Sequence, residues 1–196
     1  MQDKLIALLA GRRGHFQMES GYHSAQWFEL EPLLAQRERL RPFVAELAKR
    51  LGAHRIDAVC GPMTGGAKLA EMIAGELNVA HFHTDRFVPT VASGLFPVKY
   101  RLPPEQRETV RGKTVAIVDD AISAGSAVRG SYTDLLAHGA RPVALGALFV
   151  LGDAATRFAA DQGLALEGIA RMDFGMWKPS ECPLCQAGVG VEKVSA

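Results

Sequence analysis

Apolar runs of strand length alternate with amphipathic helical segments along most of this 196-residue chain. The helical faces lie at residues 40–51 and 69–77 and before Gly139, and the strand-like runs lie at residues 56–60, 79–83, 115–118 and 142–151. Parallel strands need long crossover connections, which are usually helices. The alternation therefore predicts an α/β fold with a central, mostly parallel sheet flanked by helices. The length fits one compact domain.

Residues 85–111 interrupt this alternation. The segment holds four prolines, one glycine and several basic residues, including Lys99 and Arg101. Prolines and glycines at this density predict a long loop or a hairpin. Loops of this length in compact domains are often functional, so we expect the segment to cover a binding site.

The stretch "TVAIVDDAISAGSA", residues 114–127, joins a predicted buried strand to two acids and a small-residue loop. In an open parallel sheet, ligands collect beyond the carboxyl ends of the strands, where Asp119 and Asp120 would emerge. Two carboxylates there can accept hydrogen bonds from paired hydroxyls or help to hold a cation. The following loop would offer backbone N–H groups and serine hydroxyls at a helix start, which suits a phosphate. A ribose phosphate satisfies both halves of the stretch.

A Walker-type ATPase is an alternative reading of the same region. Gly112, Lys113 and Thr114 spell the end of a phosphate-binding loop. However, Arg107 stands where the first glycine of that motif belongs, and the tripeptide enters a strand instead of leaving one. The sequence therefore disfavours this class.

Charge and hydropathy exclude other partners. The chain has 22 basic and 21 acidic residues, a formal net charge of +1, so no basic excess indicates nucleic acid or a membrane surface. The longest apolar stretches, such as residues 143–150, fall short of the roughly 20 residues that a spanning helix needs. We expect a soluble cytoplasmic protein.

Four segments resemble a known family. "VAIVDDAISAGSA" (115–127) resembles the phosphoribosyl pyrophosphate motif of type I phosphoribosyltransferases. "GHFQMESGYHSAQWFEL" (14–30) is similar to the N-terminal segment of orotate phosphoribosyltransferases, and "CGPMTGGAKLA" (60–70) to their pyrophosphate loop. "WKPSECPLCQAG" (177–188) resembles the C-terminal end of one branch of that family. Together these segments span most of the chain in the family's order.

The resemblance implies a magnesium-dependent enzyme of pyrimidine biosynthesis. Such an enzyme transfers phosphoribosyl from phosphoribosyl pyrophosphate to orotate, giving orotidine 5′-phosphate and pyrophosphate. It also implies a homodimer and a single phosphoribosyltransferase domain over residues 1–196. Residues 1–36 and 164–196 would form a small hood and tail. Magnesium would sit on the substrate near the two acids, with no protein side chain predicted as a firm ligand.

The resemblance also carries roles for individual residues. Asp119 and Asp120 would hold the ribose hydroxyls, and Lys99 and Arg101 would stabilise the leaving pyrophosphate. The expected 5′-phosphate contacts are Ser123, Ala124, Gly125, Ser126 and Ala127; the expected pyrophosphate contacts are Thr64, Gly65 and Gly66; and the expected base contacts are Ser20, Gly21 and His23.

The chain departs from the family pattern at several positions. Glu19 stands where many members have lysine. Residues 84–137 contain no histidine, although the usual mobile loop has one with several lysines. Leu151 and Gly152 stand where an Asp-Arg pair would meet the orotate carboxylate. A transferase for another nucleobase and a non-enzymatic phosphoribosyl pyrophosphate sensor therefore stay open as alternatives.

The tail cysteines, Cys182 and Cys185, have the spacing of half a zinc site. Cys60 is the remaining cysteine, so a histidine or a partner chain would have to complete four ligands. The sequence alone favours reduced thiols that pack a terminal turn.

Overall fold

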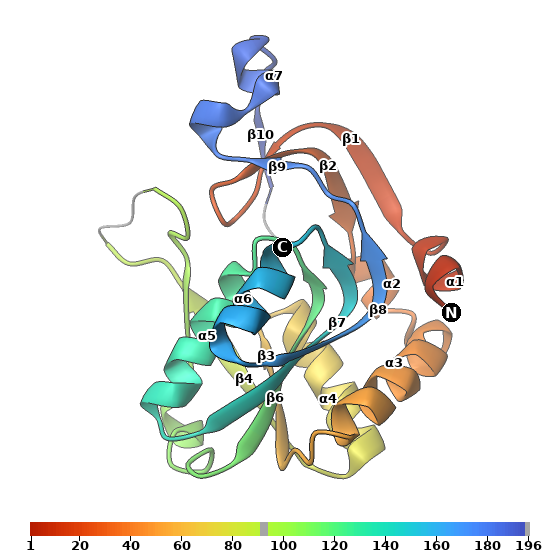
Figure 1. The fold of residues 1–196 in the computed structure, drawn as a ribbon, viewed down its shortest axis with the longest axis vertical. Coiled ribbons are helices and arrows are strands. Elements are labelled where there is room, and N and C mark those ends of the chain that lie inside the picture. Colours follow the sequence, from red (N-terminus) through yellow and green to blue (C-terminus); the bar gives the residue numbers. More distant parts are fainter. Residues whose placement is uncertain (91–93, 195–196) are drawn as a thin grey trace.

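The computed structural model describes residues 1–90 and 94–194, and a six-stranded sheet forms its centre (Figure 1). The strand order is β5-β4-β3-β6-β7-β8. The strands are β3 (Ala58–Pro62), β4 (Ala80–Phe87), β5 (Lys99–Arg101), β6 (Thr114–Ile122), β7 (Arg141–Leu151) and β8 (Ala165–Met172). All neighbouring pairs are parallel except β4 and β5. The predicted α/β fold with a mostly parallel sheet is confirmed.

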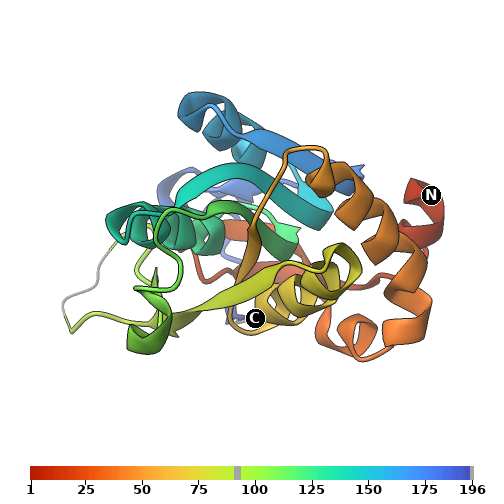
Figure 2. The same cartoon turned by 90° about the horizontal axis from the view of Figure 1, so that it is seen from below.

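Helices cover both faces of this sheet (Figure 2). The helices are α1 (Gln2–Ile6), α2 (Glu31–Leu34), α3 (Arg37–Gly52), α4 (Gly65–Leu77), α5 (Ser126–Ala137), α6 (Ala154–Gln162) and α7 (Pro183–Gln186), with 3₁₀ turns at Pro104–Gln106 and Pro179–Glu181. Buried side chains of α1, α3 and α4 form one apolar cluster with the sheet, and those of α5 and α6 form the other. The helices that connect the parallel strands thus form both outer layers of the fold.

The strand β6 is longer than its apolar run predicts. Its five residues Thr114–Val118 are buried, but the strand continues to Ile122. Asp119 pairs with Ala147 in the parallel ladder with β7, and Ala121 pairs with Phe149. Backbone pairing with a long neighbour therefore holds the two acids within the strand, whereas the sequence predicted that they would follow it.

A second, four-stranded sheet forms the hood above the central sheet in Figure 1. Its order is β10-β1-β2-β9, with β1 (Ala10–Gln17), β2 (His23–Glu29), β9 (Met176–Trp177) and β10 (Glu192–Lys193). The predicted hood boundary at residue 164 is wrong, because β8 belongs to the central sheet. Its residues Ile169 and Ala170 are buried in the core beside β7.

Residues 85–111 contain a hairpin, one of the two forms predicted. Strand β4 extends to Phe87, which pairs with Lys99, and Asp85 pairs with Arg101. Part of the predicted loop, residues 91–93, lies outside the described residues. Within 1–90 and 94–194, no helix is long and apolar enough to cross a membrane.

Candidate active site

Two half-buried carboxylates lie near the carboxyl end of β6. The backbone N–H of Asp120 donates to Oδ1 of Asp119 (3.0 Å), and the N–H of Ala121 donates to Oδ1 of Asp120 (2.7 Å). Burial and the neighbouring Asp120 raise the pKa of Asp119 well above its usual range. Burial also raises the pKa of Asp120, against the opposing effects of the Ala121 N–H and Lys68. A ligand with hydroxyl donors, or a bound cation, would offset the electrostatic cost of holding two ionised carboxylates here.

Gly65 and Gly66, which follow the turn after β3 and begin α4, pack directly against these acids. A Cβ atom on Gly65 would lie 2.2 Å from Oδ2 of Asp120. On Gly66 it would lie 2.8 Å from the backbone oxygen of Val118 and 2.9 Å from Oδ1 of Asp119. These separations are shorter than carbon contacts allow, so only glycine permits this approach. The turn and the acid pair therefore form one site.

A substitution at Gly66 is expected to damage this site. Because a Cβ there meets backbone, Gly66→Ala should cost about 1–3 kcal/mol of stability and lower turnover at least tenfold. Gly75→Ala, in the same helix and with nothing within 4 Å of the added Cβ, should gain up to about 1 kcal/mol. Chemical denaturation and pyrophosphate release measure both effects. Equal stability and turnover in the two variants would contradict the close approach.

The small-residue loop after β6 leads into the 12-residue helix α5. Gly125 lies at the helix N-cap with φ of +78°, a left-handed conformation that favours glycine. Ile122 and Ala124 are buried and anchor the loop. The first N–H groups of α5 have no carbonyl partner within the helix, so this end is suited to an anion. The structure thus places the predicted phosphate loop, residues 123–127, directly after the acid pair.

Arg129 in the first turn of α5 is a basic residue that the sequence analysis missed. Its Nε donates to the backbone oxygen of Ala124 and its Nη2 to that of Ala154, both at 3.4 Å. Its guanidinium lies 4.2 Å from the ring centroid of Phe158 and 5.9 Å from that of Phe96. The guanidinium therefore lies between the phosphate loop and the segment after β7. The sequence signal for Arg129 was its position four residues after Gly125, which puts it on the same side of the helix as the phosphate loop.

The predicted base-contacting turn meets the hairpin beside this arginine. The backbone N–H of Phe96 donates to the oxygen of Ser20 (2.8 Å). Gly21 has φ of +83°, and a Cβ there would lie 3.1 Å from the oxygen of Gly94. The rings of Tyr22 and Phe96 are 6.0 Å apart. Ser20, Gly21 and Tyr22 therefore contact residues 94–96 of the hairpin, near the phosphate loop.

His23 lies elsewhere. Its side chain is buried, and its Nδ1 is 2.9 Å from Nε2 of His15 and 3.3 Å from Sγ of Cys185. The structure thus groups His23 with the hood and tail residues, and its predicted contact with the base has no support from this geometry.

Glu19, the residue that reverses the family's charge, is neutralised within the chain. One carboxylate oxygen accepts from Nε of Arg86 (2.7 Å), and the other accepts from the hydroxyl of Tyr100. Burial and this carboxylate raise the pKa of Tyr100. The cluster joins the hood turn to the β4–β5 hairpin, so Glu19 presents a paired charge. No local sequence pattern predicts this ion pair, because its members are 67 residues apart along the chain.

Lys99 and Arg101 lie on β5 and are both exposed, whereas Tyr100 between them is buried. Successive side chains of a strand point to opposite faces. The hydroxyl of Tyr100 donates to Glu19, and the nearby carboxylate of Asp119 also raises the pKa of Tyr100. Lys99 and Arg101 therefore point away from the acid pair of their own chain, and the guanidinium of Arg101 lies 4.4 Å from the ring centroid of Phe87.

The end of β7 explains the missing Asp-Arg pair structurally. Leu151 is buried, and Gly152 has φ of +71°. A Cβ on Gly152 would lie 3.2 Å from the backbone oxygen of Phe174. An arginine at position 152 would be strained in this backbone. The guanidinium of Arg129 lies close to Gly152, because it donates to the backbone oxygen of Ala154, two residues after Gly152.

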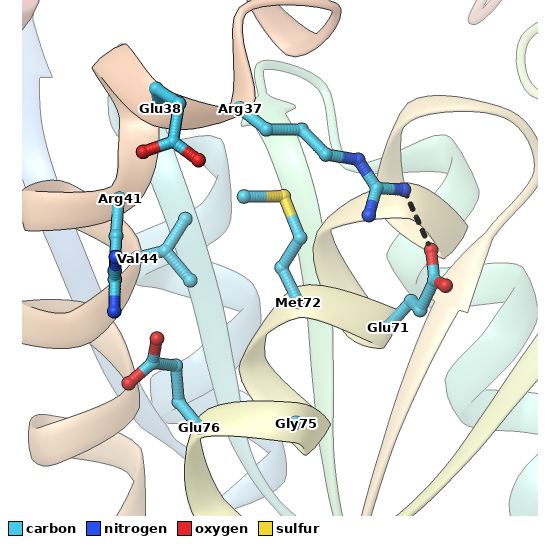
Figure 3. Close-up of a pocket in the computed structure, with 8 residues that line it drawn as sticks. All are labelled: Arg37, Glu38, Arg41, Val44, Glu71, Met72, Gly75 and Glu76. Atoms are coloured by element: carbon cyan, nitrogen blue, oxygen red, sulfur yellow. Dashed lines mark hydrogen bonds and ion pairs between the residues drawn. The ribbon is translucent and has the colours of Figure 1, made fainter.

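Two surface pockets flank helix α4. The larger, about 340 Å³, opens between α3 and α4, and Figure 3 shows that Arg37 reaches across it to Glu71 (2.9 Å). None of the predicted site residues lines it. The smaller, about 210 Å³, includes Thr64 and Lys68. The predicted pyrophosphate turn thus borders open space at the start of α4.

Comparison with curated proteins decides the family. The orotate phosphoribosyltransferase of Helicobacter pylori is 30% identical over 191 residues, which cover 91% of this chain and 90% of that protein. The chain belongs to the orotate phosphoribosyltransferase family. The family's protein from Heliobacterium modesticaldum is also 30% identical, over 89% of this chain and 85% of its own length. That from Thermotoga maritima is 29% identical over 92% and 89%. No family model matches the sequence.

Solved structures share the fold of this member of the orotate phosphoribosyltransferase family. Adenine phosphoribosyltransferase from Thermoanaerobacter pseudethanolicus has a TM-score of 0.68 at 16% identity, covering 88% of this chain and all of that one. Orotate phosphoribosyltransferase from Aeropyrum pernix has a TM-score of 0.61 at 24% identity, covering 87% and 91%. The fold is that of type I phosphoribosyltransferases, and the protein is a phosphoribosyltransferase. The resemblance read from the sequence motifs is confirmed.

Proposed function

We propose that this phosphoribosyltransferase uses phosphoribosyl pyrophosphate and orotate, and forms orotidine 5′-phosphate and pyrophosphate. The observation that carries the proposal is the close packing of the acid pair against Gly65 and Gly66, next to the phosphate loop. Curated relatives named orotate phosphoribosyltransferase at about nine-tenths coverage support the choice of base.

The chemistry breaks the bond between the anomeric carbon and pyrophosphate and forms a bond to a ring nitrogen of the base. Asp119 and Asp120 accept hydrogen bonds from the ribose hydroxyls, and the start of α5 with Ser123 and Ser126 binds the 5′-phosphate. The backbone of Thr64, Gly65 and Gly66 approaches the pyrophosphate. Positive charge that develops on the sugar is stabilised by the two nearby carboxylates.

The site fits magnesium. Two carboxylates whose pKa values are raised by burial favour a nearby cation, and Mg²⁺ binds carboxylate and phosphate oxygens. Bound with the substrate, the ion would neutralise charge on the leaving pyrophosphate. Lys68, close enough to Asp120 to oppose the rise in its pKa, adds a positive charge at the same end of α4.

We assign the orotate carboxylate to Arg129. A guanidinium has five N–H donors, and the two bonds to Ala124 and Ala154 leave others free. The side chain lies beside the segment that follows Gly152, where the family pattern places its own arginine. Arg171 on β8 is less suited to this role, because it is exposed and directed to Thr156 and the oxygen of Leu166.

Lys99 and Arg101 are proposed to serve the pyrophosphate of a partner subunit in a homodimer, because they point away from the acids of their own chain. A Lys99→Ala, Arg101→Ala variant should lose turnover more than substrate affinity. Mixed with the inactive Asp119→Asn, Asp120→Asn variant under subunit exchange, it should recover roughly a quarter of wild-type activity, since half the dimers then hold one complete site. No recovery despite exchange would contradict a shared site.

The function is tested with purified protein, magnesium and phosphoribosyl pyrophosphate. Orotate, uracil and adenine are offered separately while pyrophosphate release is followed. Release at a far higher rate with orotate than with uracil or adenine is the expected result. Release with uracil or adenine but not orotate would assign another base, and tight binding of phosphoribosyl pyrophosphate without release in any arm would favour a sensor.

A further inference from the structure

Four nitrogen and sulfur ligand atoms converge between the hood and the tail. His15 and His23 come from β1 and β2, and Cys182 and Cys185 come from the segment that begins α7. One ligand atom from each residue lies within 4.8 Å of all the others. We propose that this cluster is a structural zinc site of the Cys₂His₂ type.

The separations match those of a tetrahedral site. Nε2 of His15 is 3.4 Å from Sγ of Cys182 and 3.7 Å from Sγ of Cys185, and Nδ1 of His23 is 3.3 Å from Sγ of Cys185. Zn–S and Zn–N bonds at tetrahedral angles put N and S ligands about 3.6 Å apart. The two nitrogens are 2.9 Å apart, slightly less than the roughly 3.3 Å of such a site.

Hydrogen bonds alone account poorly for this arrangement. Nδ1 of His15 lies 2.8 Å from the carbonyl oxygen of Val189, which can only accept, so this nitrogen is the donor. In the neutral ring, Nε2 then has a single lone pair, yet His23, Cys182 and Cys185 all face it. One lone pair serves one good hydrogen bond, whereas a cation accepts lone pairs from all four atoms at once.

The same carbonyl contact is a feature of metal-binding histidines. A ligating imidazole commonly donates its other N–H to a carbonyl or carboxylate, which sets its tautomer and orientation. The carbonyl of Val189 performs this role for His15, and Val189 itself belongs to the tail. The two-residue spacing of the cysteines is also typical of zinc sites.

The fold brings both histidines to one face. His23 pairs directly with Gln17 across the β1–β2 ladder. The ladder shifts register between Arg13 and Phe16, and beside this irregularity the imidazole of His15 meets that of His23, with Nε2 and Nδ1 2.9 Å apart. Both imidazoles are at least nine-tenths buried, and Cys182 is fully buried, so three of the four ligands are shielded from water. Cys185 is exposed and offers a path for the metal to enter.

A zinc ion here would fasten the tail onto the hood. His15 and Cys182 are 167 residues apart in sequence, and β10 adds only two paired residues between tail and β1. The ligands must be deprotonated and ordered together, so zinc binding would contribute directly to the folding of this region. His23 directly follows the turn that holds Ser20 and Gly21, so the metal would also fix that turn.

The experiment measures zinc in the full-length protein. Wild type and Cys60→Ala, whose cysteine lies outside the cluster, should hold about one zinc per chain, and Cys182→Ser, Cys185→Ser should hold less than about a tenth. Cobalt added to chelator-treated wild type should give the visible absorption of tetrahedral cobalt with a thiolate charge-transfer band. Zinc added to the same protein should raise its Tm by at least about 5 °C.

The wild-type measurements decide the question even if the cysteine variant fails to fold. Wild type that binds neither zinc nor cobalt after reduction and titration would overturn the site. Zinc retained equally by the folded cysteine variant, or a Cys182–Cys185 disulfide in place of metal, would overturn it as well. Because metal content is read without substrate, these outcomes are independent of the base and of turnover.

Discussion

The double variant Asp119→Asn, Asp120→Asn is expected to bind phosphoribosyl pyrophosphate with magnesium roughly 10²–10⁴-fold more weakly than wild type. The substitution keeps the shape of each side chain but removes both charges. A hydrogen bond to a charged group contributes about 1.5–3 kcal/mol, and two such acceptors are lost. Titration calorimetry measures the affinity. Asp3→Asn, an exposed change on α1, should leave it unaltered.

The single variant Asp119→Asn should at the same time be more stable than wild type without ligand. Burial and Asp120 raise the pKa of Asp119, so the ionised carboxylate is disfavoured in the folded protein. A raised pKa means that wild type loses stability as the pH rises through that value, and asparagine avoids this loss. At neutral pH, Tm should rise by about 2–4 °C for each kcal/mol gained in the free energy of unfolding, and this gain should vanish in acid.

These two measurements together separate a functional site from an ordinary acidic turn. Weaker binding with higher stability is the signature of charges kept for a ligand. Unchanged affinity of the double variant for phosphoribosyl pyrophosphate would show that the two acids do not bind this substrate. Lower stability of Asp119→Asn at neutral pH would show that the carboxylate is compensated within the chain.

Arg129→Met is expected to lower kcat/KM for orotate by about 10- to 150-fold, the loss of one charge-assisted interaction of 1.5–3 kcal/mol. Methionine keeps an apolar stem against Phe158 and Phe96 while removing the guanidinium. A pyrimidine without the carboxylate, such as uracil, should not share this loss. The ratio of kcat/KM for orotate to that for uracil should therefore fall.

The control is Arg157→Met on α6, an exposed arginine paired with Asp153, which should leave the ratio unchanged. The Tm of both variants shows whether lost packing contributes. If Arg129→Met lowers both pyrimidines equally, the arginine supports the phosphate loop and does not meet the carboxylate. If it lowers neither, another group binds the orotate carboxylate.

Local sequence determined the central architecture. Apolar periodicity was sufficient for α3, α4 and α5 and for β3, β4, β6 and β7, because one buried face is set by residues three or four apart in a helix and two apart in a strand. It did not predict α6 or β8, the last crossover helix and edge strand of the central sheet. The acid pair followed by small residues likewise predicted where substrate would bind, since parallel strands present their carboxyl ends at one edge. The length of β6 was misjudged because its last residues are held by pairing with β7.

The neighbours of the predicted residues were decided only by the tertiary structure. Glu19 and Arg86 are 67 residues apart, and His15 and Cys182 are 167 apart. No local pattern encodes such pairs, because they depend on how the hood folds back over the hairpin and how the tail returns to β1. The sequence alone predicted the acid pair, the phosphate loop and the glycines Gly65 and Gly66, which the structure brings together. Long-range packing decided that Glu19 is neutralised, that Arg129 reaches the end of β7, and that two histidines meet the two tail cysteines, because burial and electrostatic pairing act between groups close in space, whatever their separation along the chain.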